Sequence, residues 1–209
     1  VMKLTPNGKT TYFYWKLFVA FIPAAVLGLL FSDAIDAMLE SVVVVAVMLV
    51  IGGVFMLFCD KIFNKGSEST PFTEKRAFMV GLFQCISMIP GVSRSMATIV
   101  GGMAQKLTRR AAAEFSFFLA VPTMAAATAL DFLQLFFGDE ADASWATRDN
   151  LTMLALGCVV AFVVALLAMK WFVDFLAKYG FKAFGIYRII VGLVILGFLW
   201  SGHSLVMVD

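Results

Sequence analysis

The long apolar runs of this chain constrain its fold more than any other feature. Between positions 151 and 169 no residue carries a charge. A helix needs about 20 mostly apolar residues to cross a hydrocarbon core about 30 Å thick. The whole chain is 62% hydrophobic and only 14% charged, whereas soluble domains are about 45–50% apolar and about 25% charged. The sequence therefore predicts an all-α, polytopic integral membrane protein.

Five runs are long enough to span the membrane, and each is bordered by charged or polar residues. We expect the spans at about 12–31, 41–58, 111–136, 151–173 and 184–200. A sixth apolar segment, at about 77–103, is interrupted by polar residues. We expect all of these segments to form a single membrane domain over residues 1–209.

Basic residues orient the segments, because Lys and Arg in short loops stay on the cytoplasmic side. One basic cluster precedes the interrupted segment, namely Lys61, Lys65, Lys75 and Arg76. A second follows it, namely Lys106, Arg109 and Arg110. If the segment crossed the membrane, one cluster would lie outside. The charges therefore favour a re-entrant hairpin that enters and leaves on the same side, and they place the acidic loop at 138–150 outside.

The interruption itself predicts a pocket. Residues 78–89 make a helix of about 18 Å, which reaches the middle of the hydrocarbon core. Pro90 and Gly91 then stop the helix, and a second half-helix is expected over 93–103. Non-helical backbone at this depth is tolerated only where protein or a water-filled cavity surrounds it.

The residues after the break are suited to an anion. The start of a helix presents unpaired N–H groups and the positive end of its dipole. Ser93, Ser95 and Thr98 add hydroxyl groups, with Thr98 expected on the same side of the half-helix. Arg94 adds a permanent cation whose planar fork matches phosphate oxygens. Together these residues predict a phosphate site.

Structural explanations compete with this prediction. A serine or threonine alone often caps a helix or bridges two helices, and Gln84 either contacts a ligand or pairs with a neighbouring helix. An arginine at membrane depth costs about 2.5–3.5 kcal/mol, which favours a function for Arg94. If the segment instead lies at the interface, Arg94 is a snorkelling anchor. Tyr187 and Arg188 are interpreted as interfacial anchors of the last span.

Other chemistries find little support in the sequence. The cysteines are widely spaced and the single histidine, His203, follows the last apolar run, so a zinc site is not expected. The net charge of +2 is small and the basic residues are scattered, so no nucleic-acid partner is expected. Motifs of soluble nucleotide-binding enzymes, hydrolases and metalloproteases are absent.

Two stretches together resemble a known family. "GLFQCISMIPGVSRSMATIVGGM" (81–103) and "TRRAAAEFSFFLAVP" (108–122) closely resemble the second signature region of the undecaprenyl-diphosphate phosphatases, also called bacitracin-resistance proteins. "IPAAVLGLLF" (22–31) and "YRIIVGLVIL" (187–196) are similar to further stretches of that family. The resemblance covers nearly the whole chain.

The resemblance implies an activity and a place. Family members remove the terminal phosphate of undecaprenyl diphosphate, and the undecaprenyl phosphate formed carries cell-wall precursors across the bacterial plasma (inner) membrane. It also implies roles in peptidoglycan synthesis, antibiotic resistance and cell shape, a divalent cation, Mg²⁺ or Ca²⁺, and an inverted repeat with two re-entrant hairpins.

The resemblance also assigns site residues. It makes Arg94 the residue that binds the diphosphate, with Ser93, Ser95 and Thr98 beside it as catalytic residues. Gln84 and Gly91 are the further substrate-binding residues expected from the same hairpin.

One departure from the family concerns the metal. The family's first signature, two glutamates four apart followed by a serine-rich turn ending in histidine, is expected before the first span and is not found in these 209 residues. Its carboxylates are the implied metal ligands, so the ligands in this chain are unknown. We expect the sequence to be part of a longer protein.

The sequence is therefore compatible with two functions. The first is a membrane phosphohydrolase acting on a polyprenyl diphosphate, in which either a serine hydroxyl or a metal-activated water attacks phosphorus. The second is a lipid-phosphate transporter or flippase that uses the same anion site without hydrolysis. The sequence leaves open whether the chain forms a homo-oligomer.

Overall fold

The protein is seen in a computed structural model that describes residues 10–63, 65–137 and 147–201. His203 and most of the acidic loop expected at 138–150 lie outside these residues. The described residues form eight α-helices and one short 3₁₀ turn, with no strand among them. The predicted all-α class is confirmed.

Five helices have a segment long and apolar enough to cross a membrane. They are α1 (Thr10–Leu30), α3 (Val42–Phe63), α6 (Arg109–Phe137), α7 (Arg148–Tyr179) and α8 (Lys182–Trp200). They match the five predicted spans, with ends that differ by a few residues. Every side chain from 151 to 171 on α7 is exposed, and most of them are apolar, as expected of a surface that faces lipid or another protein segment.

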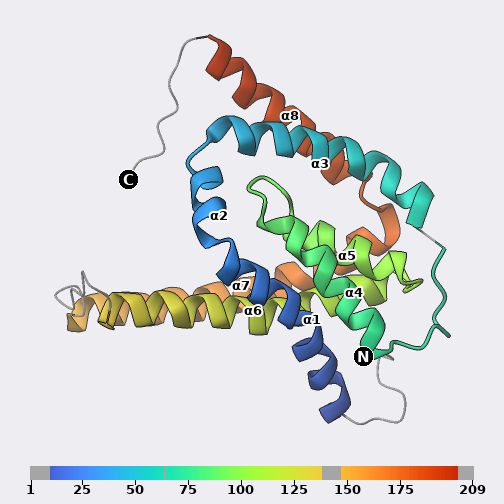
Figure 1. Ribbon diagram of the computed structural model, residues 1–209, viewed down its shortest axis with the longest axis horizontal. Coiled ribbons are helices and arrows are strands. Elements are labelled where there is room, and N and C mark those ends of the chain that lie inside the picture. Colours follow the sequence, from blue (N-terminus) through green and yellow to red (C-terminus); the bar gives the residue numbers. More distant parts are fainter. Residues whose placement is uncertain (1–9, 64, 138–146, 202–209) are drawn as a thin grey trace.

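The sequence prediction missed one helix. The acidic connection after the first span forms α2 (Ser32–Leu39), which has Asp33 in its first turn and no buried residue. The helix has eight residues and contains no long apolar run, so the sequence carries no strong signal for it. A helix this short also receives little stability from its own hydrogen bonds. It links α1 to α3 (Figure 1).

The interrupted segment forms the predicted re-entrant hairpin. It consists of α4 (Glu74–Cys85), the 3₁₀ turn η2 (Ile86–Met88) and α5 (Arg94–Ala104). The backbone N–H of Ser67, before the hairpin, donates to the carbonyl oxygen of Lys106, after it, at 3.2 Å. The chain therefore enters and leaves at the same end. In Figure 1 the hairpin occupies the centre, between the α3 and α8 pair and the α6 and α7 pair.

The first arm of the hairpin ends earlier than predicted. We expected one helix to continue to Ile89, but the α-helix stops at Cys85 and a 3₁₀ turn follows. Ile89 has extended backbone angles, φ −69° and ψ 119°. Proline disfavours helical backbone in the residue before it, so Pro90 begins to unwind the helix before the break itself.

The ends of four helices meet at one side of the molecule. Arg109, at the start of α6, pairs with Asp60 of α3 at 3.0 Å and donates to two carbonyl oxygens near the end of α7. Asp60 also accepts from the backbone N–H of Phe181, just before α8, at 2.7 Å. The basic clusters on both sides of the hairpin adjoin this end. The contacts agree with the sidedness that the charges predict.

Small residues let the helices around the hairpin approach closely. A Cβ at Gly81 of α4 would lie 2.2 Å from the carbonyl oxygen of Ala20 on α1, and one at Gly101 of α5 would lie 2.7 Å from Phe83. Membrane helices gain stability from such close packing, because the hydrophobic effect does not drive them together. At Gly101 the neighbour that approaches closely is the hairpin's own first arm.

Candidate functional site

Gly91 forms the tip of the hairpin and requires the absence of a side chain. Its φ is +86°, and a Cβ there would lie 2.4 Å from the carbonyl oxygen of Val45 and 3.0 Å from Met48. Both residues belong to α3. The hairpin tip therefore packs against a spanning helix through backbone atoms, and its position depends on glycine at 91.

Ser93 caps the second arm of the hairpin. Its backbone is extended, and its hydroxyl oxygen accepts from the N–H of Met96 at 3.3 Å. The same oxygen lies 3.2 Å from the hydroxyl oxygen of Ser95. The predicted helix start is confirmed. Both hydroxyl groups lie at the positive end of α5, where an anion is favoured.

Arg94 is held by neutral groups. Its Nη2 donates to Oε1 of Gln84 at 2.9 Å and to Oγ1 of Thr123 at 3.2 Å, while its buried Nε has no partner. No carboxylate in the described part of the chain pairs with this guanidinium. A partly buried cation without a counter-ion is costly unless something neutralises it. Arg94 is therefore suited to bind an anion.

Gln84 and Thr123 form the support of Arg94. Gln84 is only 2% exposed, and its amide nitrogen lies 3.5 Å from the Thr123 hydroxyl. That hydroxyl in turn donates to the carbonyl oxygen of Leu119 at 2.8 Å. One donor and two acceptor positions of the hydroxyl are thus all used. The network fixes the direction in which the guanidinium points.

Sequence reasoning did not find Thr123. It lies 29 positions after Arg94, on a different helix. The available signal was its place directly after Pro122 inside an apolar span, where a polar side chain is uncommon. Gln84, by contrast, was named as a candidate, and its amide oxygen contacts Arg94 rather than open space.

Thr98 lies behind the site rather than in it. It is fully buried; its hydroxyl donates to the carbonyl oxygen of Arg94 at 2.9 Å and lies 2.6 Å from the hydroxyl of Ser116 on α6. We expected it to face the same side as the other hydroxyls. The i to i−4 bond to the backbone turns it toward α6 instead. Its catalytic role stays a prediction.

Arg188 differs from its sequence interpretation. We interpreted it, with Tyr187, as an interfacial anchor. Tyr187 is 67% exposed, as an anchor would be. Arg188 instead turns inward and donates from Nη2 to the carbonyl oxygen of Gly91 at the hairpin tip. The interpretation of Arg188 was wrong because the partner lies 97 positions away in the sequence.

The described residues around the break do not suit a divalent cation. Mg²⁺ and Ca²⁺ bind carboxylate and other oxygen ligands, and no group of three His, Cys, Asp or Glu side chains gathers anywhere in the described ranges. The amide oxygen of Gln84 already accepts from Arg94, whose charge repels a second cation.

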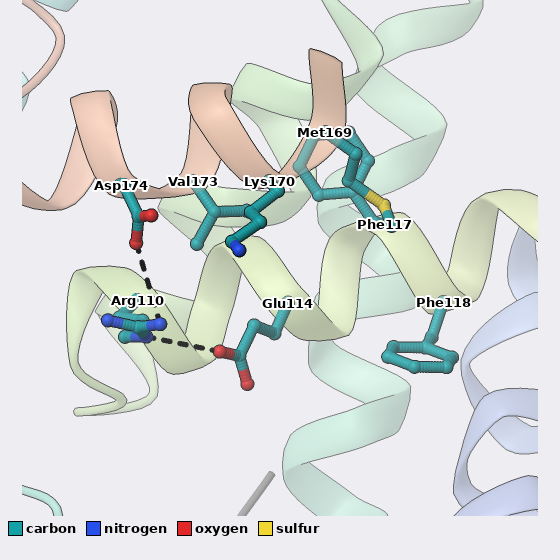
Figure 2. Close-up of a pocket in the computed structure, with 8 residues that line it drawn as sticks. All are labelled: Arg110, Glu114, Phe117, Phe118, Met169, Lys170, Val173 and Asp174. Carbon is teal, nitrogen blue, oxygen red and sulfur yellow. Dashed lines mark hydrogen bonds and ion pairs between the residues drawn. The ribbon is translucent and has the colours of Figure 1, made fainter. Parts of the chain in front are cut away.

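A cavity of about 190 Å³ opens between α6 and α7, away from the hairpin tip. Figure 2 shows Arg110 between Glu114 and Asp174, at 3.2 Å and 3.5 Å, so charges on its rim already pair with one another. The cavity has a mixed charge and therefore does not resemble an anion site.

Comparisons with known proteins agree on one family. The family described as "Bacitracin resistance protein BacA" matches residues 2–194. A relative from Flavobacterium psychrophilum, named undecaprenyl-diphosphatase, is 56% identical over 200 residues, which is 96% of this chain and 75% of the relative. A relative of the same name from Porphyromonas gingivalis is 54% identical over 193 residues, or 92% of this chain and 68% of the relative.

A third relative is more distant but carries the same name. The undecaprenyl-diphosphatase of Bdellovibrio bacteriovorus is 48% identical over 200 residues, which is 94% of this chain and 73% of the relative. The family match over residues 2–194 includes the hairpin and the segment that carries Thr123. With the family match over most of its length, the chain belongs to the bacitracin resistance protein BacA family.

Proposed function

We propose that the chain is a membrane phosphohydrolase that removes the terminal phosphate of undecaprenyl diphosphate and gives undecaprenyl phosphate. The observation that carries the proposal is the Arg94 guanidinium at the hairpin break, which neutral groups hold and no described carboxylate neutralises. Homologous proteins named undecaprenyl-diphosphatase support the reaction class. The names of these relatives give no support to the transporter alternative.

In this proposal the start of α5 binds the diphosphate. Arg94 and the first N–H groups of the helix neutralise phosphate oxygens, and the hydroxyls of Ser93 and Ser95 donate to the same group. Catalysis of phosphoryl transfer is mostly positioning and stabilisation of charge. Gln84 and Thr123 supply the positioning, since they fix the guanidinium. The lipid tail lies along apolar helix surfaces.

Two groups are candidates for the attack on the terminal phosphorus, a serine hydroxyl and water. If a hydroxyl of Ser93 or Ser95 attacks the terminal phosphorus, the bond to the bridging oxygen breaks, undecaprenyl phosphate leaves and a phosphoserine remains for water to hydrolyse. If water attacks directly, no phosphoserine forms. Single-turnover trapping with labelled substrate distinguishes the two, because label on a serine requires the first route.

The proposal extends to setting and cofactor. The family resemblance favours the bacterial plasma (inner) membrane, recycling of the lipid carrier for peptidoglycan synthesis, and contributions to bacitracin resistance and cell shape. It also favours a requirement for Mg²⁺ or Ca²⁺. Titration of the purified full-length protein with each cation after chelation tests that requirement, with activity restored by the cation if the requirement holds.

One experiment separates hydrolysis from transport. The full-length protein is purified, reconstituted in vesicles and supplied with undecaprenyl diphosphate, and both inorganic phosphate and the remaining lipid are measured. The proposal predicts one phosphate released for each undecaprenyl phosphate formed. Movement of intact undecaprenyl diphosphate across the bilayer without release of phosphate would contradict it and favour the transporter.

A further inference from the structure

Arg188 links the last helix to the tip of the hairpin. It lies on α8, which packs along α3, and its Nη2 donates to the carbonyl oxygen of Gly91. Gly91 also packs against Val45 and Met48 of α3. The tip is therefore held by two contacts, the close approach to α3 and a charged hydrogen bond from α8. Figure 1 shows α3 and α8 lying together on one side of the hairpin.

Gly52 of α3 leaves the room that Arg188 needs. A Cβ at position 52 would lie 3.2 Å from Nη2 of Arg188 and 3.7 Å from its Cζ. The three nearest atoms to that Cβ all belong to Arg188. The guanidinium therefore passes directly over the α3 backbone on its way to the hairpin, and any side chain at 52 would crowd it.

The Gly91 carbonyl needs a partner of this kind. Gly91 lies where the backbone leaves the helical conformation, so its carbonyl oxygen does not belong to a helix ladder. An unpaired backbone group at membrane depth is strongly disfavoured. A guanidinium N–H makes a stronger hydrogen bond to it than a neutral donor would.

The charge of Arg188 has no other evident use within the described ranges. No carboxylate there pairs with it, and its buried Nε is without a partner. This differs from Arg109, whose charge is balanced by Asp60. In this part of the chain Arg188 thus combines the cost of a partly buried cation with one hydrogen bond, which it donates to the hairpin tip.

We propose that Arg188 is a positioning residue, which fixes the Gly91 carbonyl so that α5 begins at a fixed place and presents Ser93 and Arg94 to the substrate. The kinetic consequence rests on the proposed function, whereas the hold on the hairpin does not. Displacements of about 1 Å at a reacting centre cost about 100-fold in rate, so a loosened tip is expected to lower turnover.

The kinetic test uses Arg188→Met in the full-length protein. We expect kcat for phosphate release to fall by about 10- to 100-fold, with KM changed by less than about threefold, because Arg188 acts on the hairpin and not on the lipid. Arg188→Lys should restore part of kcat, since a single donor serves a single carbonyl. Lys182→Met, which removes an exposed cation from the same helix, should leave both constants unchanged.

A second readout does not depend on catalysis. Hydrogen exchange of the amides at 91–95 should be faster in Arg188→Met than in the parent protein, with the amides of α7 unchanged. If the parent protein releases no phosphate, the proposed function fails, while faster exchange still supports the hold on the hairpin. Unchanged exchange of the amides at 91–95 would overturn the inference. So would a raised KM with normal kcat, which would make Arg188 a substrate contact.

Gly52→Ala tests the same contact without removing the charge. Alanine favours the helix relative to glycine, so α3 should remain folded, but the new methyl group crowds Arg188. We expect a kcat loss of a few-fold, smaller than in Arg188→Met, together with faster exchange of the amides at 91–95. The matched control is Gly157→Ala on α7, where a Cβ meets nothing within 4 Å. Equal kcat and equal hydrogen exchange in Gly52→Ala and Gly157→Ala would contradict the proposal.

Discussion

Arg94 and Arg109 are arginines of the same chain in opposite electrostatic settings. Arg109 pairs with Asp60 at 3.0 Å and donates to the carbonyl oxygens of Leu176 and Ala177. Arg94 contacts only neutral acceptors among the described residues, namely Gln84 and Thr123. The contacts of Arg109 join helix ends, and Asp60 neutralises its charge. The contacts of Arg94 keep its charge available, which is what binding of an anion requires.

The largest effect is expected from removing the available charge. Arg94→Ala should lower kcat/KM for phosphate release by about 10³-fold or more, as for other arginines that stabilise a transferring phosphoryl group. The protein should still fold, because Arg94 makes no ion pair with any residue that the structure describes. Phosphate release and the thermal unfolding midpoint are measured together. Near-normal turnover in this variant would contradict the site assignment.

A smaller loss is expected when Arg94 is made to resemble Arg109. Gln84→Glu is nearly isosteric and places a carboxylate at the oxygen that lies 2.9 Å from Nη2 of Arg94. The new charged hydrogen bond is worth about 1.5–3 kcal/mol, and the diphosphate must compete with it. We expect kcat/KM to fall by about 10- to 100-fold. Unchanged kinetics in this variant would indicate that Arg94 does not meet the substrate.

The reverse change at the other arginine should affect stability instead. Asp60→Asn removes the charge opposite Arg109 and leaves an arginine that is mostly buried without a counter-ion. We expect the folded state to lose about 1–3 kcal/mol and the thermal midpoint to fall. Turnover for each folded molecule should stay the same. Lost turnover in fully folded Asp60→Asn protein would show that the two arginines do not divide their roles as described.

The smallest effect is expected at Thr123. Thr123→Val keeps the shape of the side chain and removes the hydroxyl that accepts from Arg94 at 3.2 Å. Loss of one such hydrogen bond is worth about 1 kcal/mol, or about fivefold in kcat/KM. Ser116→Ala on the same helix removes a hydroxyl that contacts Thr98 and not the guanidinium. Equal losses in the two variants would argue against a specific role for Thr123.

The sequence predicted the features of the fold that depend on local signals. Five apolar runs and two basic borders predicted the spans and the re-entrant hairpin, because helix length and charge position are local properties. Pro90 and Gly91 predicted the break, and the serine at 93 predicted the start of α5. These features need no knowledge of the neighbours in space.

The contacts that distinguish Arg94 from Arg109 are not local. Thr123 lies 29 positions from Arg94, and the carbonyl bound by Arg188 lies 97 positions away. The sequence around Arg94 does not indicate which helix packs against its side chain. The turning of Thr98 toward α6 was missed for the same reason, since its partner Ser116 is on another helix.

The most direct test compares one charged and one neutral replacement of Gln84. The affinity of full-length Gln84→Glu and Gln84→Met for a methylene diphosphonate analogue of the lipid, which resists hydrolysis, is measured in the same detergent. Both variants lose the amide, but only glutamate neutralises Arg94. We predict at least about tenfold weaker binding for Gln84→Glu than for Gln84→Met. Equal affinities would contradict the claim that an unpaired Arg94 charge binds the diphosphate.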